Sequence, residues 1–111
     1  MIELTILENL KKKLSVPVAL EERGVQSGSF VIFEKTSGSK ENHLESSVFA
    51  FQSYGPSMYE AAKLNDEVKQ AVEGMIELDE FASIKLNSDY NFTDTSTKRY
   101  RYQAVFDMKH Y

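Results

Sequence analysis

The sequence predicts an α+β domain, with a mainly antiparallel sheet, one long helix packed across it and a short N-terminal helix. Two observations support the helices: an amphipathic stripe opens the chain, and a longer one occupies its middle. A third supports the sheet: segments of β-branched, aromatic or alternating apolar residues lie on both sides of the longer stripe. The order helix, strand, hairpin, helix and two strands is typical of a layered α+β domain.

Residues 2–14 predict the short helix, because five apolar residues fall on one helical face: Ile2, Ile6, Leu7, Leu10 and Leu14. Pro17 disfavours a helical conformation at Val16, so we expect the helix to stop near Ser15. Residues 16–21 then read as a short strand, and residues 22–29, which contain two glycines, as a loop.

Residues 29–36 and 43–54 predict the two arms of a β-hairpin. The first contains the run Phe30-Val31-Ile32-Phe33, and the polar residues 37–42 between the arms favour a turn. Phe49 and Phe51 lie on one face of the second arm, and Val48, Ala50 and Tyr54 lie on the other with Leu44. Both faces therefore need cover, one from the core and the other from a partner.

Gly55-Pro56 ends this strand, and Ser57 to Glu60 has the form of a capping box that starts the long helix. Its apolar stripe runs as far as Met75, and we expect the helix to continue through Gly74 to about Glu77. Residues 81–87 predict a strand and residues 88–97 a polar, turn-rich loop. Residues 98–109 predict a half-buried strand with five residues on its inner face: Tyr100, Tyr102, Ala104, Phe106 and Met108.

Composition indicates one domain over residues 1–111: the chain is 41% hydrophobic and 27% charged. The absence of cysteine excludes disulfides, thiolate metal sites and thiol nucleophiles. We expect no signal peptide and no membrane span, and synthesis in the cytosol is the default reading. The net charge of −4 argues against sequence-independent phosphate binding.

No catalytic, metal or cofactor motif is evident, so the sequence predicts a protein that is not an enzyme and has no cofactor. His43 and His110 have no second ligand at metal-like spacing and read as exposed histidines at strand ends. The acidic residues near the end of the long helix do not follow a calcium-loop pattern and read as a solvated helix end: Glu73, Glu77, Asp79 and Glu80.

The segment Lys98-Arg99-Tyr100-Arg101-Tyr102 leaves two readings open. Aromatic residues between basic ones are typical of a surface that stacks on single-stranded nucleic acid. Alternation in a half-buried strand gives the same pattern, with the tyrosines in the core or an interface and Arg99 and Arg101 facing water. We favour the second reading.

Two segments resemble a known family: residues 52–68, QSYGPSMYEAAKLNDEV, and the ending that begins at Tyr90 and contains RYRYQAVF. Their order, together with LSVPVALEE and FVIFEKTSG upstream, resembles the tail-terminator or tail-completion proteins of long, non-contractile-tailed bacteriophages and their prophages. The resemblance covers almost the whole chain. It implies an α+β subunit without catalytic residues or cofactor, which assembles into a ring, commonly a hexamer.

The implied role is structural. Such a ring caps the tail tube, ends its polymerisation and provides the surface that joins tail to head, so the implied partners are other copies of the chain, the tube protein and a head-tail connector protein. The implied location is the head-tail junction of the virion, after synthesis in the bacterial cytoplasm, and genomic DNA would pass through the ring without sequence-specific binding. Candidate interface positions, chosen from pattern alone, are Phe49, Phe51, Tyr54, Ser37, Gly38, Ser39, Lys40, Tyr90 and Asn91.

Two other functions remain open. A head-tail connector or adaptor of the phage neck belongs to the same structural class. A small nucleic-acid-binding module would use the basic and aromatic residues of the 98–102 segment.

Overall fold

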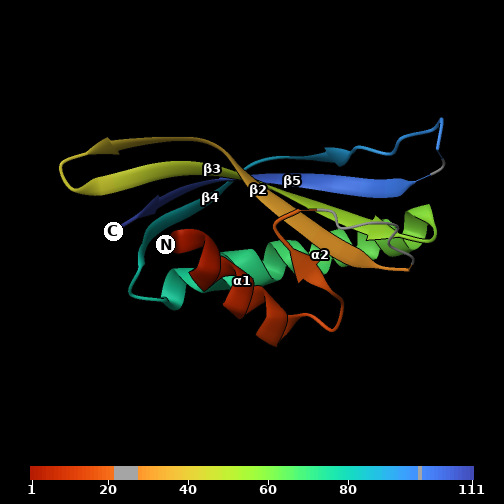
Figure 1. Cartoon of the computed structure of the whole chain (residues 1–111), viewed down its shortest axis with the longest axis horizontal. Helices are drawn as coiled ribbons and strands as arrows, with labels where there is room; N and C mark the ends of the chain where they lie inside the picture. Colours follow the sequence, from red (N-terminus) through yellow and green to blue (C-terminus); the bar gives the residue numbers. More distant parts are fainter. Residues whose placement is uncertain (22–27, 98) are drawn as a thin grey trace.

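Five strands and two α-helices build the part of the chain that the computed structural model describes, residues 1–21, 28–97 and 99–111. The strands form one mixed sheet in the order β1-β2-β3-β5-β4, and both helices lie on the same side of it (Figure 1). The α+β class is therefore as predicted. The sheet is not purely antiparallel, because β1 (Val18–Ala19) pairs in parallel with β2 (Phe30–Glu41).

Helix α1 (Ile2–Lys13) buries Ile6 and Leu10, with the other members of the predicted stripe packed around them. It ends at Leu14, whose backbone N–H donates to the carbonyl of Leu10 at 2.9 Å. The following strand is shorter than the predicted 16–21 segment. The loop predicted from residue 22 lies mostly outside the described residues, as does Lys98 at the predicted start of the last strand.

Strands β2 and β3 (Leu44–Gly55) form the predicted hairpin, but its turn was placed wrongly. Residues 37–41 continue β2 and pair with β3, after a register shift between Lys35 and Ser37. The turn consists of Asn42 and His43, with φ of 52° and 68°, values typical of a two-residue type I′ hairpin turn. The long hairpin projects beyond the helices at one end of the molecule (Figure 1).

Helix α2 (Met58–Gly74) starts as predicted, with the Ser57 hydroxyl accepting the backbone N–H of Glu60 at 3.2 Å. The chain continues through Gly74 into a 3₁₀ turn, η1 (Met75–Glu77). Gly55, at the end of β3, allows a close approach to the first turn of the helix, since a Cβ there would lie 2.7 Å from the backbone nitrogen of Ala61.

Strands β4 (Phe81–Asn91) and β5 (Tyr100–His110) complete the sheet. β5 pairs antiparallel with β3 and β4, so β3 and β5 are both interior strands. β4 is longer than predicted and has register shifts at Phe81/Ser83 and Leu86/Ser88, which alter the simple alternation expected over residues 81–87. The predicted inner face of β5 is confirmed at Ala104, Phe106 and Met108, all of which are buried.

One apolar core lies between the helices and the inner face of the sheet. Phe33, Phe49, Phe51 and Phe106 are completely buried there and contact one another through stacked, tilted and edge-on rings. The face of β3 that carries Phe49 and Phe51 is therefore the covered face. In the described chain, the helices leave the opposite face of the sheet uncovered, and we call it the open face.

Candidate interaction surface

The open face carries a continuous network of aromatic, amide and guanidinium groups across three strands. β3 contributes Gln52 and Tyr54, and β5 contributes Arg101 and Gln103, which face the same side because Gln52 pairs with Gln103 and Tyr54 with Arg101. Tyr90 joins from β4 opposite Gln103. We call these residues, together with Phe92, the open-face network.

Hydrogen bonds link the centre of this network. The Tyr54 hydroxyl donates to Gln52 Oε1 at 3.0 Å, and Gln52 Nε2 donates to Gln103 Oε1 at 2.9 Å. Gln103 Nε2 in turn donates to the Tyr90 hydroxyl. Because each amide uses its oxygen as acceptor and its nitrogen as donor, the side chains hold one another in fixed orientations.

Arg101 lies at one end of the network and is held by aromatic rings. Its guanidinium carbon is 4.4 Å from the ring centroid of Phe92 and 5.7 Å from that of Tyr54. Nε donates to the Phe92 carbonyl at 2.6 Å, and one terminal nitrogen donates to the Tyr54 hydroxyl at 2.9 Å. The prediction that Arg101 simply faces water is wrong, since the side chain is half-buried and packed on these rings.

Tyr54 was predicted as an interface residue and lies within this network, but the residue is only 4% exposed. It stacks on Phe30 at a centroid distance of 4.4 Å, and Arg99 lies 5.0 Å from its centroid on the open face. Tyr90 and Phe92 are more accessible, at 40% and 39% exposed, and their rings meet edge to face at 5.9 Å. These two rings and Arg101 are the part of the network that a partner can reach.

The other predicted interface residues lie elsewhere. Phe49 and Phe51 have no exposed surface, so in this conformation neither is available to a neighbouring subunit. Asn91 ends β4, and its side-chain oxygen accepts the backbone N–H of Thr93 at 3.0 Å. The predicted turn residues are exposed on the projecting half of β2 and form no loop: Ser37, Gly38, Ser39 and Lys40.

A groove of about 490 Å³ lies beside this projecting half of the hairpin. Serine side chains from three strands line it, together with Lys85, Asp107 and Lys109. Asp107 accepts from the side-chain amide of Asn87 at 3.2 Å, so this carboxylate already has a partner. The groove is open, and it lies toward the opposite end of the sheet from Arg101.

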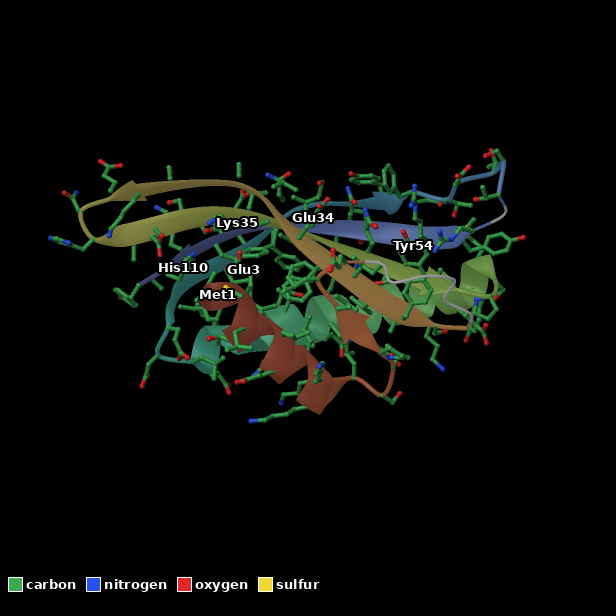
Figure 2. All side chains as sticks on the ribbon, in the orientation of Figure 1. Met1, Glu3, Glu34, Lys35, Tyr54 and His110 are labelled. Atoms are coloured by element: carbon green, nitrogen blue, oxygen red, sulfur yellow. The ribbon has the colours of Figure 1, made fainter. Side chains whose placement is uncertain are left out.

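A serine, a histidine and a carboxylate meet at this end, in the order used by nucleophilic hydrolases. Ser47 Oγ and His110 Nε2 are 2.8 Å apart, and His110 Nδ1 is 3.7 Å from Glu45 Oε2. The prediction that His110 is exposed is wrong: it is 2% exposed, as is Ser47, and its ring packs edge-on against Phe81. Because both side chains are buried, the Ser47–His110 hydrogen bond is a buried polar contact in this conformation. His110 and Tyr54 lie toward opposite ends of the sheet (Figure 2).

A second polar cluster joins β4 to α2 on the covered side. Asn65 Nδ2 donates to Asp89 Oδ1 at 2.7 Å, and Lys69 Nζ donates to Asp89 Oδ2 at 2.5 Å. The hydrogen bond that Lys69 donates to Asp89 is the main cause that raises the pKa of Lys69 above its usual value, and Asp66 raises this pKa further. This cluster ties the edge strand to the helix.

Within residues 1–21, 28–97 and 99–111, no group of three histidine or acidic side chains is placed to hold a metal ion. The helices of the described chain lack the length and apolar character needed to cross a membrane. Comparison of the sequence with protein-family models and with curated proteins gives no match.

Sequence reasoning missed Gln52, Phe92 and Gln103 as members of the surface. The register between β3 and β5 decides that the two glutamines meet, and it connects residues 51 positions apart. The alternation in β5 does predict that Arg101 and Gln103 lie on the same face of the sheet. Alternation alone does not identify the strand that pairs with β5.

Proposed function

We propose that this chain is a structural subunit of a bacteriophage tail terminator, which forms a ring on the end of the tail tube. The observation that carries the proposal is the resemblance in residues 52–68 and in the ending with RYRYQAVF. In space these two segments form one unit, because β3 pairs with β5 along its length and leads directly into α2.

The proposed mechanism is geometric. One side of the ring matches the docking surface of a tube subunit, while the other side lacks the surface needed to add another subunit. Tube growth therefore ends, and a head connector binds instead. The net charge of −4 suits a ring through which DNA passes without adhering. Two surfaces of this chain support assembly: the accessible aromatic residues of the open-face network, and the hairpin that projects beyond the helices.

Deletion of the gene from its phage or prophage, followed by electron microscopy of the lysate, tests this function. We expect tails of abnormal length that do not join full heads, and restoration of joined virions when the wild-type gene is supplied in trans. Normal joined virions from the deletion strain would overturn the proposal.

The same images separate the closest alternative. A head-tail connector or adaptor acts after the tube has reached its length, so its loss would leave tails of normal length without heads. Uniform, normal-length tails in the deletion lysate would favour that role over termination.

A nucleic-acid-binding module is the second candidate, because Tyr90, Phe92 and Arg101 place accessible rings beside a guanidinium. Retention of the purified protein on single-stranded DNA, weakening steeply with added salt, would support it. Absence of retention at low salt would remove it.

A further inference from the structure

The accessible end of the open-face network combines residue types that dominate protein interfaces. Tyr, Phe and Arg are enriched at such contacts because rigid rings and a planar guanidinium bury a large area at low entropic cost. Tyr90, Phe92 and Arg101 are already oriented by their mutual contacts. The guanidinium donates to two uncharged acceptors, the Phe92 carbonyl and the Tyr54 hydroxyl, so no carboxylate balances its positive charge through these bonds.

A complementary groove lies on the helix side of the same chain. It has a volume of about 200 Å³, and its lining includes Tyr59, Glu60, Lys63 and Glu67 from the first turns of α2. Tyr59 is 74% exposed, an unusual position for a tyrosine on a helix packed against a core. The exposed charged residues of α2 are mostly acidic: Glu60, Lys63, Asp66, Glu67 and Glu73. We call the site formed by Tyr59, Glu60, Lys63 and Glu67 the α2 groove.

We propose that the Tyr90–Phe92–Arg101 end of the open-face network binds in the α2 groove of a second copy of this chain. Arg101 then lies against the carboxylates of Glu60 and Glu67, and the rings of Tyr90 and Phe92 lie against Tyr59. The proposal rests on the proposed ring function and identifies the two surfaces by which its subunits associate.

Geometry favours a second copy as the occupant. Helix α2 lies on the side of the sheet opposite to the open face, so one copy can bind a neighbour through each surface (Figure 1). Such a contact joins two different surfaces, and contacts of this kind produce rings when the rotation between copies closes. A stable interface buries about 800 Å² on each partner, so two of them would use a moderate share of the 6671 Å² accessible surface.

Charge reversal provides the test, with the full chain as the sample. Glu67→Lys changes an exposed groove residue, and Arg101→Glu changes the opposite surface. Self-association is measured by sedimentation velocity and native mass spectrometry in about 50 mM and about 500 mM salt. We expect each single variant to weaken self-association at least about tenfold, as expected for close charge pairs at an interface. The double variant, and an equimolar mixture of the two single variants, should recover it.

Glu8→Lys on α1 is the matched control, because it makes the same charge change at an exposed position outside both surfaces. It should leave self-association unchanged. Since Arg101 contacts Tyr54 and Phe92 inside the protomer, circular dichroism must show that Arg101→Glu is folded. If Arg101→Glu is unfolded, the comparison of Glu67→Lys with Glu8→Lys decides whether the α2 groove takes part in self-association.

Three results would overturn the proposal: a wild-type chain that stays monomeric up to about 1 mM, equal effects of Glu67→Lys and Glu8→Lys, or a folded double variant that fails to recover association. Binding of a fluorescent single-stranded oligonucleotide that Arg101→Glu abolishes, without self-association, would assign the surface to nucleic acid instead. Self-association through this pair of surfaces together with normal virions in the deletion strain would leave the interface in place and remove the tail function.

Discussion

Ser47 on β3 and His110 on β5 share a buried hydrogen bond, with Oγ and Nε2 2.8 Å apart on the covered face of the sheet. The two residues are diagonal neighbours, since Ser47 pairs with Met108 and Glu45 with His110. The contact therefore connects successive positions of β3 and β5, two neighbouring interior strands, and fixes their register near the end of the sheet.

Ser47→Ala should lower the free energy of unfolding by about 1–3 kcal/mol, because it leaves the buried imidazole nitrogen without a partner. Urea denaturation followed by circular dichroism measures the change. Ser46→Ala, on the opposite face of the same strand, is the control and should change the value by less than about 0.5 kcal/mol. Equal effects of the two variants would contradict a role for the histidine contact.

Phe51→Ala should cost about 3–5 kcal/mol, because the ring is fully buried among three other phenylalanines and its removal leaves a cavity. The same urea denaturation experiment, carried out at micromolar protein concentration, measures this loss in the free energy of unfolding. Leu86→Ala, whose side chain is 44% exposed, provides the comparison and should have a small effect. A small loss for Phe51→Ala would mean that this ring contributes little to the protomer and would return it to the list of interface candidates.

Gly55→Ala should destabilise the protein by about 1–3 kcal/mol, because the added Cβ would lie 2.7 Å from a backbone nitrogen that cannot move without shifting α2. At Gly74, near the other end of the helix, nothing lies within 4 Å of an added Cβ. There the same substitution should stabilise the protein by about 1 kcal/mol through higher helix propensity. Thermal unfolding of both variants checks the opposite signs.

His43→Gly should stabilise the protein by about 1 kcal/mol, because His43 has a φ of 68°, a region that costs an ordinary residue energy but is free to glycine. Asn42 followed by glycine is also the preferred pair for a type I′ turn. His43→Val should have the opposite effect, since a β-branched side chain tolerates this conformation poorly. An increase in melting temperature for the valine variant would rule out the assigned turn.

Lys69→Met should destabilise the protein by about 1 kcal/mol at neutral pH, and the loss should shrink in strong alkali. The pKa of Lys69 is raised in the folded state, chiefly by the hydrogen bond to Asp89, so its contribution is present below the unfolded pKa of 10.5 and is lost as the pH rises through the folded pKa. Denaturation of wild type and variant at about pH 9 and about pH 12 measures the difference. Lys63→Met, at an exposed position on the same helix, is the matched control.

Features set by neighbouring residues were predictable from the sequence. The Ser57 cap, the stripes of both helices and the inner face of β5 depend on spacings of a few residues, and the structure has each of them. The hairpin turn was misplaced because the polar run from Ser37 to Asn42 has turn composition throughout. Strand pairing, which composition does not report, extends the regular structure to Glu41.

The candidate surface was harder to predict because it depends on contacts between distant segments. Alternation in β3 gives two faces but does not say which one the helices cover, so Phe49 and Phe51 were assigned to a partner although they form the core. The burial of His110 likewise follows from its packing against Phe81 and Ser47, and its position near the end of the sequence gives no sign of it.

The interior position of β5 also constrains the order of folding. The β2–β3 hairpin joins neighbouring segments and needs to close only a short loop, whereas docking of β5 on β3 brings together residues such as Gln52 and Gln103, 51 positions apart. Closure of long loops slows folding, so formation of the β3–β5 pair is expected to set the rate. During synthesis, the edge of β3 that pairs with β5 therefore stays unpaired until β5 has been made.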